Sequence, residues 1–322
     1  MLQLAARFAE TGYLVIEDVL NPAEVAEARE LLSAHRKAHA AARWWSPPGC
    51  PGRSFEGRYG PDAEAGRWQC NALFSDDATL EPLFERLMHH PTLQPLVRHL
   101  VGPDLCLRSC WTMFRDPVLV PPPPPETREV GSAWASASGV HYQMWHREEG
   151  GVCLPDHPYF IHSLQVKVEL DECSSTTHCI STVPESVQQK QALPRQWEGR
   201  GSHALQGDPG TDGRWMIDRE IEYWKNTHKM EGAVDIACPA GAAIVFNNSN
   251  FHAGTVRQTT SHRRSFAFDW GHESLIRGFD NNEDRGFPAR IIARFPDELG
   301  YMTVEESGSR RNIGQAASTA RL

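Results

Sequence analysis

The sequence predicts a mainly β protein in which an antiparallel, two-sheet barrel carries helices on its outside. The first observation is a helical N-terminal third, where residues 21–42 and 78–102 have apolar side chains at helical spacing and the second stretch is divided at Pro91. The second is a series of short apolar or alternating segments after residue 104, separated by turns. Helices that precede such a run of strands indicate an α+β arrangement with a double sheet.

The first helix has a clear starting signal. Residues 12–20 are apolar and β-rich, and they predict a strand that leads into it. Asn21 is the expected N-cap, and Pro22 suits the first helical position because its missing N–H has no partner there anyway. A helix is therefore expected over residues 21–42.

The strands are expected over residues 105–120, 161–170, 178–186, 241–256 and 263–271. Alternation is cleanest in 161–170, where one face takes the apolar residues Leu164, Val166, Val168 and Leu170 and the other takes Ser163, Gln165, Lys167 and Glu169. A further helix is expected over 218–226. Five prolines at 121–125 forbid regular pairing and predict a loop.

Composition limits the classes of function. The 322 residues carry a formal net charge of −9, which argues against a nucleic-acid groove or an anionic membrane surface as the main partner. No apolar run reaches the ~18–20 residues of a membrane span, and the N-terminus lacks the pattern of a signal peptide. Eight scattered cysteines without a C-x-x-C pair favour reduced, mostly buried thiols. We expect a cytoplasmic monomer or homodimer with a small-molecule partner, no nucleic acid and no membrane.

Two histidines and a glutamate suit a mononuclear metal site. His146 and Glu148 stand two positions apart, and residues i and i+2 of a strand point to the same side. His252 follows an apolar strand segment 106 residues further on and is the best third ligand. Two imidazole nitrogens and one carboxylate on one face describe the triad that leaves positions on Fe(II) open for substrate and oxygen.

An arginine extends this pattern. Arg263 comes eleven residues after His252, at the start of the next expected strand. A guanidinium can bind the far end of a dicarboxylate through two parallel N–H···O bonds, so 2-oxoglutarate would reach from the iron to Arg263. Arg264 is the competing residue, because neighbouring strand residues face opposite sides and only one of the two can point inward.

Together these features resemble the phytanoyl-CoA dioxygenase family of Fe(II)/2-oxoglutarate-dependent oxygenases. The resemblance covers most of the chain, from "FAETGYLVIEDVLNPAEVAEA" (8–28) through "WHRE", "LQVKVELDECSSTTHCISTVPES" and "GAAIVFNNSNFHAGT" to "RRSFAF". The strand–helix opening, the H-x-D/E…H pattern and the arginine about eleven residues beyond the second histidine all have counterparts.

The resemblance implies a double-stranded β-helix core, of the jelly-roll or cupin-like kind, and a set of site residues. The catalytic iron ligands that it implies are His146, Glu148 and His252. Arg263 would hold the C5 carboxylate of 2-oxoglutarate, and Gln165 and Thr112 would also line the co-substrate pocket. The implied cofactors are Fe(II), 2-oxoglutarate as co-substrate and O₂, with ascorbate as a candidate stimulant.

Two positions depart from the family pattern. Glu148 stands where the family usually has Asp, and its extra methylene would shift the carboxylate without abolishing ligation. Gly254 replaces the usual small hydroxyl residue two positions after His252, so one hydrogen bond to 2-oxoglutarate is either lost or supplied by Thr255. Halogenases of this superfamily replace the carboxylate by Gly or Ala, so Glu148 favours oxygen insertion or a related oxidation.

One domain is expected over residues 1–308. Its parts are a helical N-terminal part (1–103), the jelly-roll core (104–275) and a C-terminal extension (276–308). Residues 309–322 are expected to form a flexible tail.

The expected activity is oxidation, most simply hydroxylation, of an unactivated C–H bond of a small molecule in secondary-metabolite biosynthesis, with release of succinate and CO₂. Desaturation, ring formation or epoxidation at the same site stays open. A zinc-dependent hydrolase on a cupin-like barrel is an alternative, since two His and one Glu also bind catalytic zinc, but it leaves Arg263 without a role. A non-catalytic small-molecule binding protein of the same fold is the other.

Overall fold

The structure is a computed structural model of the chain. The residues that it describes are 1–38, 44–45, 67–70, 78–102, 105–115, 163–184, 232–248, 250–255, 261–272, 294–295, 302–304 and 310–312. The predictions for 121–125 and 218–226 lie outside the described residues. The helices are α1 (Leu2–Thr11), α2 (Pro22–Ala38), the 3₁₀ turn η3 (Ala78–Leu80), α3 (Glu81–Met88) and α4 (Leu93–Val101).

Helix α2 begins where the sequence predicts. The side chain of Asn21 accepts hydrogen bonds from the backbone N–H groups of Ala23 (2.9 Å) and Glu24 (3.0 Å). Glu24 in turn accepts one from the N–H of Asn21 at 2.8 Å, which closes a reciprocal cap. Pro22 is the first helical residue, as expected. The structure describes this helix over Pro22–Ala38, and residues 39–42 of the predicted range lie outside the described residues.

Helix α1 is an element that the sequence analysis did not assign. It buries Phe8 and ends at Gly12, whose φ of 71° is left-handed. The N–H of Gly12 bonds the carbonyl of Phe8, so this glycine turns the chain directly into the first strand.

Seven strands form a large sheet in the order β1-β8-β5-β10-β4-β3-β2. In chain order they are β1 (Tyr13–Ile16), β2 (Trp44–Trp45), β3 (Arg67–Cys70), β4 (Leu105–Arg115), β5 (Ser163–Glu169), β8 (Ala243–Asn247) and β10 (Arg263–His272). All pairs are antiparallel except β2 with β3. The centre of this sheet is β10, which pairs with β5 on one side and β4 on the other.

A small sheet in the order β7-β6-β9 faces the large one. Its strands are β6 (Ile180–Val183), β7 (Val234–Ile236) and β9 (Phe251–Gly254). Ile180 and Ile236 from the small sheet pack with Ile244 and Phe246 of β8, which shows that the two sheets share an interior. Antiparallel double sheets of this kind agree with the predicted jelly-roll core.

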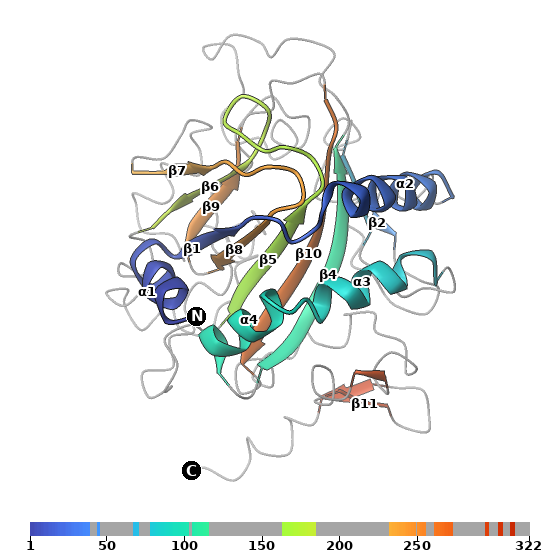
Figure 1. Cartoon of the computed structure of the whole chain (residues 1–322). Coiled ribbons are helices and arrows are strands. Elements are labelled where there is room, and N and C mark those ends of the chain that lie inside the picture. The colour runs from blue at the N-terminus through green and yellow to red at the C-terminus, as the bar shows by residue number, and fades with distance from the viewer. Residues whose placement is uncertain are drawn as a thin grey trace, which may run out of the picture.

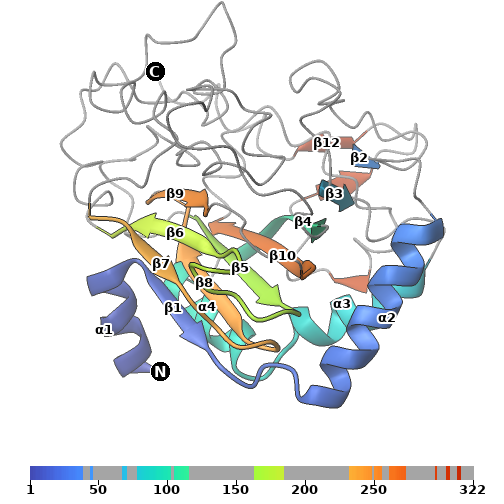
Figure 2. The ribbon, with the colours of Figure 1, turned by 90° about the horizontal axis from the view of Figure 1, so that it is seen from above.

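The helices cover the opposite face of the large sheet. Figure 1 shows α3 and α4 lying across β5, β10 and β4, and in Figure 2 α3 lies on one side of β5 and β10 while β6 and β9 lie on the other. Phe268 of β10 stacks on Phe84 of α3 with ring centroids 4.8 Å apart. The larger hydrophobic core therefore lies between the helices and the large sheet, and a smaller apolar cluster lies between the two sheets, where buried polar side chains are also found.

Several predicted strands are shorter than expected. The range 12–20 contributes only Tyr13–Ile16, and 241–256 is divided into β8 and β9 by a turn. Part of the predicted flexible tail (309–322) forms a strand. This strand is β12 (Arg310–Asn312), and it pairs with β11 (Met302–Val304) in an antiparallel two-stranded sheet. Five of the eight cysteines are free and buried, as predicted: Cys106, Cys110, Cys173, Cys179 and Cys238. Among the described helices, none combines the length and apolar character that a membrane crossing needs.

Gly241 provides a test of the turn that joins the N-terminal segment to β8. Its φ is +87°, and an added Cβ would lie 2.3 Å from the carbonyl oxygen of Leu20. Its N–H and carbonyl bond Glu169 and Leu20 respectively. Gly241→Ala should lower the free energy of unfolding by about 2–3 kcal/mol, measured by denaturant unfolding, because both the backbone and the contact are strained. A loss below about 1 kcal/mol would show that the turn can relax away from Leu20.

Candidate iron and co-substrate site

The polar face of β5 looks into the space between the sheets. Gln165, Lys167 and Glu169 alternate with Val166 and Val168, which belong to the core under the helices. All three residues are at most 7% exposed. The prediction that the polar and apolar residues of this segment lie on opposite faces of the strand is therefore confirmed.

His252 enters the same space from the small sheet. It is 6% exposed, and its ring lies edge-on to Phe246 of β8 with centroids 5.1 Å apart. Its Nδ1 is 2.9 Å from the carbonyl oxygen of Asn250. A carbonyl can only accept, so Nδ1 carries the proton and the lone pair of the neutral ring lies on Nε2. Metal-binding histidines are commonly oriented by such a contact, so this donor fits the predicted role.

The carbonyl that orients His252 is itself held from the N-terminal segment. Asn250 is fully buried, and its side-chain amide packs directly against Gly12, where an added Cβ would lie 2.1 Å from Nδ2. Gly12 also accepts a hydrogen bond from the N–H of Asn247 at 2.9 Å. The end of α1 thus supports the turn between β8 and β9 that presents His252.

Arg263 lies between the sheets and is paired with Glu169. It is 4% exposed, and its Nε donates to Oε2 of Glu169 at 3.1 Å while its Nη2 donates to Oε1. Burial alone would raise the pKa of Glu169, but Arg263 and then Lys167 outweigh it and hold the pKa below its usual range. The pair is therefore ionised, and one edge of the guanidinium is occupied by it.

The Nη1/Nη2 edge of the Arg263 guanidinium is not the edge that contacts Glu169. No described residue accepts a hydrogen bond from its Nη1. Because a guanidinium has two edges that can each form a two-point contact with a carboxylate, Glu169 and a bound carboxylate can share Arg263 without competing.

Arg264 lies on the opposite face of β10. Its Nε and Nη2 donate to Asp171 at 2.9 and 2.6 Å, and its guanidinium carbon is 5.7 Å from the ring centre of Phe114. Arg29 of α2 also contacts Asp171, at 3.2 Å. Of the two neighbouring arginines, the structure directs Arg263 to the space between the sheets and Arg264 to the helices.

The two remaining predicted pocket residues lie on different faces. Gln165 is in register with Phe246 on one side and Asp269 on the other, so it lies on the face that Arg263 and Phe246 share. Thr112 is in register with Phe266, which is part of the core under the helices, and its hydroxyl donates to the carbonyl of Ser265 at 3.1 Å. The register of β4 therefore places Thr112 on the helix-covered face of the sheet, opposite to the face of Arg263.

Thr255, the residue expected as a substitute for the hydroxyl that Gly254 lacks, contacts the segment before β6. Its Oγ1 accepts a hydrogen bond from the N–H of Cys179 at 2.9 Å and lies 3.5 Å from Nδ1 of His178. Burial raises the pKa of Cys179 to about 11, so this neighbour is a neutral thiol. Thr255 thus ties β9 to the segment before β6.

His146 and Glu148 lie outside the described residues, and no group of three or more metal-binding side chains occurs within the described ranges. Among the described residues, the groups suited to these ligands are therefore His252 for a metal and Arg263 for a carboxylate. Sequence reasoning missed Glu169 as the partner of Arg263; its only signal was a charged residue on the polar face of β5.

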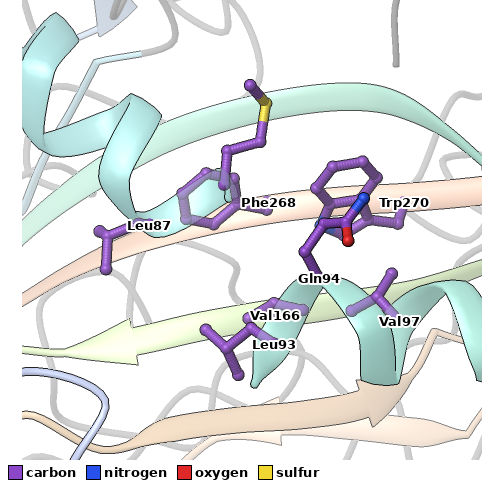
Figure 3. A pocket seen from close by; sticks show the side chains of 8 residues that line it. Leu87, Leu93, Gln94, Val97, Val166, Phe268 and Trp270 are labelled. Atoms are coloured by element: carbon purple, nitrogen blue, oxygen red, sulfur yellow. The ribbon is translucent and has the colours of Figure 1, made fainter. Parts of the chain in front are cut away.

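A small hollow between α3, α4 and the large sheet is a different feature. Figure 3 shows that it is lined by core side chains and one polar residue, Gln94. Val166, Phe268 and Trp270 contribute from the sheet, all from the face that the helices cover. Since Arg263 lies on the other face, this hollow is not the co-substrate site.

A double antiparallel sheet with a buried histidine and a buried arginine on its inner faces defines a protein of the 2-oxoglutarate oxygenase class. Residues 8–265 match the model of the family Phytanoyl-CoA dioxygenase (PhyH), and the chain belongs to this family of Fe(II)/2-oxoglutarate-dependent oxygenases. It is therefore an oxidoreductase whose cofactors are Fe(II) and 2-oxoglutarate. The search among curated proteins gave no match.

Solved structures share the fold. The carbocyclase SnoK from nogalamycin biosynthesis is 15% identical, with 85% of this chain and 84% of that chain covered and a TM-score of 0.53. HygX from Streptomyces hygroscopicus, with nickel and 2-oxoglutarate bound, is 17% identical over 84% and 87% of the two chains, with a TM-score of 0.51. The epimerase SnoN, in complex with Fe3+, alpha ketoglutarate and nogalamycin RO, is 18% identical over 87% and 90%, with a TM-score of 0.50.

The two carboxylate–arginine pairs on either side of β10 provide a matched test. Glu169→Gln removes a fully buried negative charge and should lower the free energy of unfolding by about 3–5 kcal/mol, since Arg263 then remains charged without a counterion. Asp171→Asn weakens a partly exposed pair and should cost about 1 kcal/mol. Denaturant unfolding of both variants makes the comparison. Equal losses would mean that water reaches Arg263 as readily as Arg264.

Proposed function

We propose that this enzyme oxidises, most simply by hydroxylation, an unactivated C–H bond of a small molecule in secondary metabolism. The observation that carries the proposal is Arg263, which is buried between the sheets eleven residues after His252 and whose Nη1 donates to none of the residues that the structure describes. A zinc hydrolase would have no use for such a group, whereas a dicarboxylate co-substrate requires it.

The proposed iron ligands are His146, Glu148 and His252. His252 has the orienting contact expected of a ligand, because Nδ1 is fixed on the carbonyl of Asn250. His146 and Glu148 are assigned from their i, i+2 spacing and from the family pattern. With 2-oxoglutarate bound, the iron supplies oxidation of the substrate by O₂, and the co-substrate leaves as succinate and CO₂.

The protein positions 2-oxoglutarate and excludes water from the site. Arg263 would bind the distal carboxylate of 2-oxoglutarate through its Nη1/Nη2 edge, while Glu169 keeps the other edge fixed. Phe246 packs against His252 and closes the interior beside Gln165, which has a polar group to orient the co-substrate. A fixed, dry site of this kind lowers the reorganisation needed during the reaction.

The similar solved structures include enzymes with several different reactions, so they do not identify one product for this enzyme. SnoK is a carbocyclase and SnoN an epimerase, and HygX has been crystallised with hygromycin B. These relatives in fold support a small-molecule substrate for this chain. Glu148 supports oxygen insertion or a related oxidation over halogenation, because a carboxylate occupies the position where halide would bind.

Co-substrate turnover tests the proposal directly. Anaerobic addition of Fe(II) and 2-oxoglutarate should produce the weak visible charge-transfer band of a chelated keto acid, and aerobic incubation with ascorbate should release succinate. His252→Ala should lose both signals because two remaining ligands hold iron poorly. His99→Ala, on the exposed face of α4, is the control and should retain them. If the wild-type protein shows no charge-transfer band and releases no succinate, it is a binding protein or a different enzyme.

The two adjacent arginines test the co-substrate contact. Arg263→Lys keeps a charge but loses the two-point fork, so 2-oxoglutarate should bind with ~1.5–3 kcal/mol less free energy, a roughly tenfold to hundredfold rise in Kd. Arg264→Lys, on the helix side of the same strand, should leave the Kd nearly unchanged. Titrations of both variants with 2-oxoglutarate decide the matter, and a larger effect at Arg264 would contradict the assignment.

A further inference from the structure

Lys167 is a buried charged residue that the proposed chemistry does not use. It lies on the inner face of β5, and its side chain is 8% exposed. Its Nζ lies 4.0 Å from Oε1 of Glu169, which is too far for a hydrogen bond, and it makes no hydrogen bond to a described residue. An ammonium has three donors, so such burial is unfavourable unless a ligand completes the contacts.

Glu169 does not need Lys167 as a partner. Both carboxylate oxygens of Glu169 already accept hydrogen bonds from Arg263. Oε1 is the oxygen nearest to Lys167 and also the one that Nη2 of Arg263 contacts. When protonated, Lys167 would thus be a second cation beside one carboxylate whose contacts with Arg263 are complete, and a second anion would balance its charge.

The register sets Lys167 between the two ends of the proposed co-substrate site. It pairs with Ala267 of β10 and with Ile244 of β8. One same-face step along β5, about 7 Å, leads to Glu169 and so to Arg263; one step the other way leads to Gln165 beside Phe246. Phe246 contacts His252. Along β5, Lys167 therefore lies between the positions that lead to the guanidinium of Arg263 and to His252, and its neighbour on β10 is the small residue Ala267.

The charges around Lys167 favour its neutral form when no ligand is present. The pKa of Lys167 is lowered to about 7: burial is the largest cause, Arg263 and Arg115 add to it, and Glu169 and Cys173 oppose it. Asp269 lies one same-face step beyond Ala267 and accepts a hydrogen bond from Asn248 at 2.8 Å. A bound carboxylate would reverse this balance by adding a negative charge within reach of Nζ.

We infer that Lys167 is a second binding residue for the distal carboxylate of the 2-oxo acid, that it shares this group with the Nη1/Nη2 edge of Arg263, and that it takes up a proton when the co-substrate binds. The inference rests on the proposed function. It adds a residue on β5 to the co-substrate site and makes co-substrate affinity depend on pH.

The direction in which 2-oxoglutarate affinity changes with pH follows from the protonation of Lys167 in the ligand-free protein. Below about pH 7 the ammonium is already present and 2-oxoglutarate binds at full strength. Above it the proton must be added on binding, so affinity should fall about tenfold between pH 6 and pH 8, with uptake of about one proton at pH 8. Folding responds in the opposite sense: since the pKa is about 7 when folded and 10.5 when unfolded, the ligand-free protein gains stability from this group as pH rises through that range.

Calorimetric titration of the Ni(II)-loaded protein tests this without turnover. The probes are 2-oxoglutarate and 2-oxobutyrate, which shares the metal-binding end and lacks the distal carboxylate. Wild type should show proton uptake with 2-oxoglutarate alone, measured in two buffers of different ionisation enthalpy. Lys167→Met should weaken 2-oxoglutarate about 10- to 100-fold at pH 6, leave 2-oxobutyrate unchanged and abolish the proton uptake.

Lys167→Arg is the second variant, because it keeps a charge that does not titrate in this range. It should bind 2-oxoglutarate with an affinity that is flat between pH 6 and pH 8. Thermal unfolding confirms that both variants fold, and Lys167→Met should lack the stability gain above pH 7. If Lys167→Met binds 2-oxoglutarate like wild type, or weakens both acids equally, the inference is overturned. If neither acid binds the metal-loaded wild type, the proposed function fails instead.

Discussion

The ion pair between Arg263 and Glu169 is the interaction on which the interior of the barrel depends. A guanidinium between two sheets is destabilising without a counterion, and the effective penalty is several kcal/mol. Glu169 removes that penalty from a position that is itself fixed: its N–H bonds the carbonyl of Ala242 and its carbonyl accepts from Gly241. The arginine is thereby oriented before any ligand arrives, which reduces the entropy lost on binding.

Strand alternation separates two kinds of interior around this pair. Val166 and Val168 join the helices in an apolar core, while Lys167 and Glu169, between and beyond them in the chain, point to the other sheet. A one-residue slip of β5 would exchange these sets and put charges under the helices. The apolar core therefore also enforces the register that keeps the charged groups inside the barrel.

Local patterns made much of this predictable. The cap at Asn21 and the alternation of 161–170 depend on nearest neighbours in sequence, and the structure agrees with both. The face of the sheet on which Thr112 lies depends instead on how β4 aligns with β10. Family position alone does not give this alignment. Glu169 contacts a residue 94 positions away, and such pairing is set by tertiary structure. Helix α1 was missed because its first residues were considered only as a targeting signal.

The pairing of β1 with β8 has a consequence for how the enzyme is made. Tyr13 aligns with Phe246, so the first strand to be synthesised waits for a partner more than two hundred residues later. Gly12, next to it, supports the turn that presents His252. Loop closure over such a span is slow compared with local contacts. His252 is therefore oriented only after these distant segments have met, which makes this contact a late step in folding.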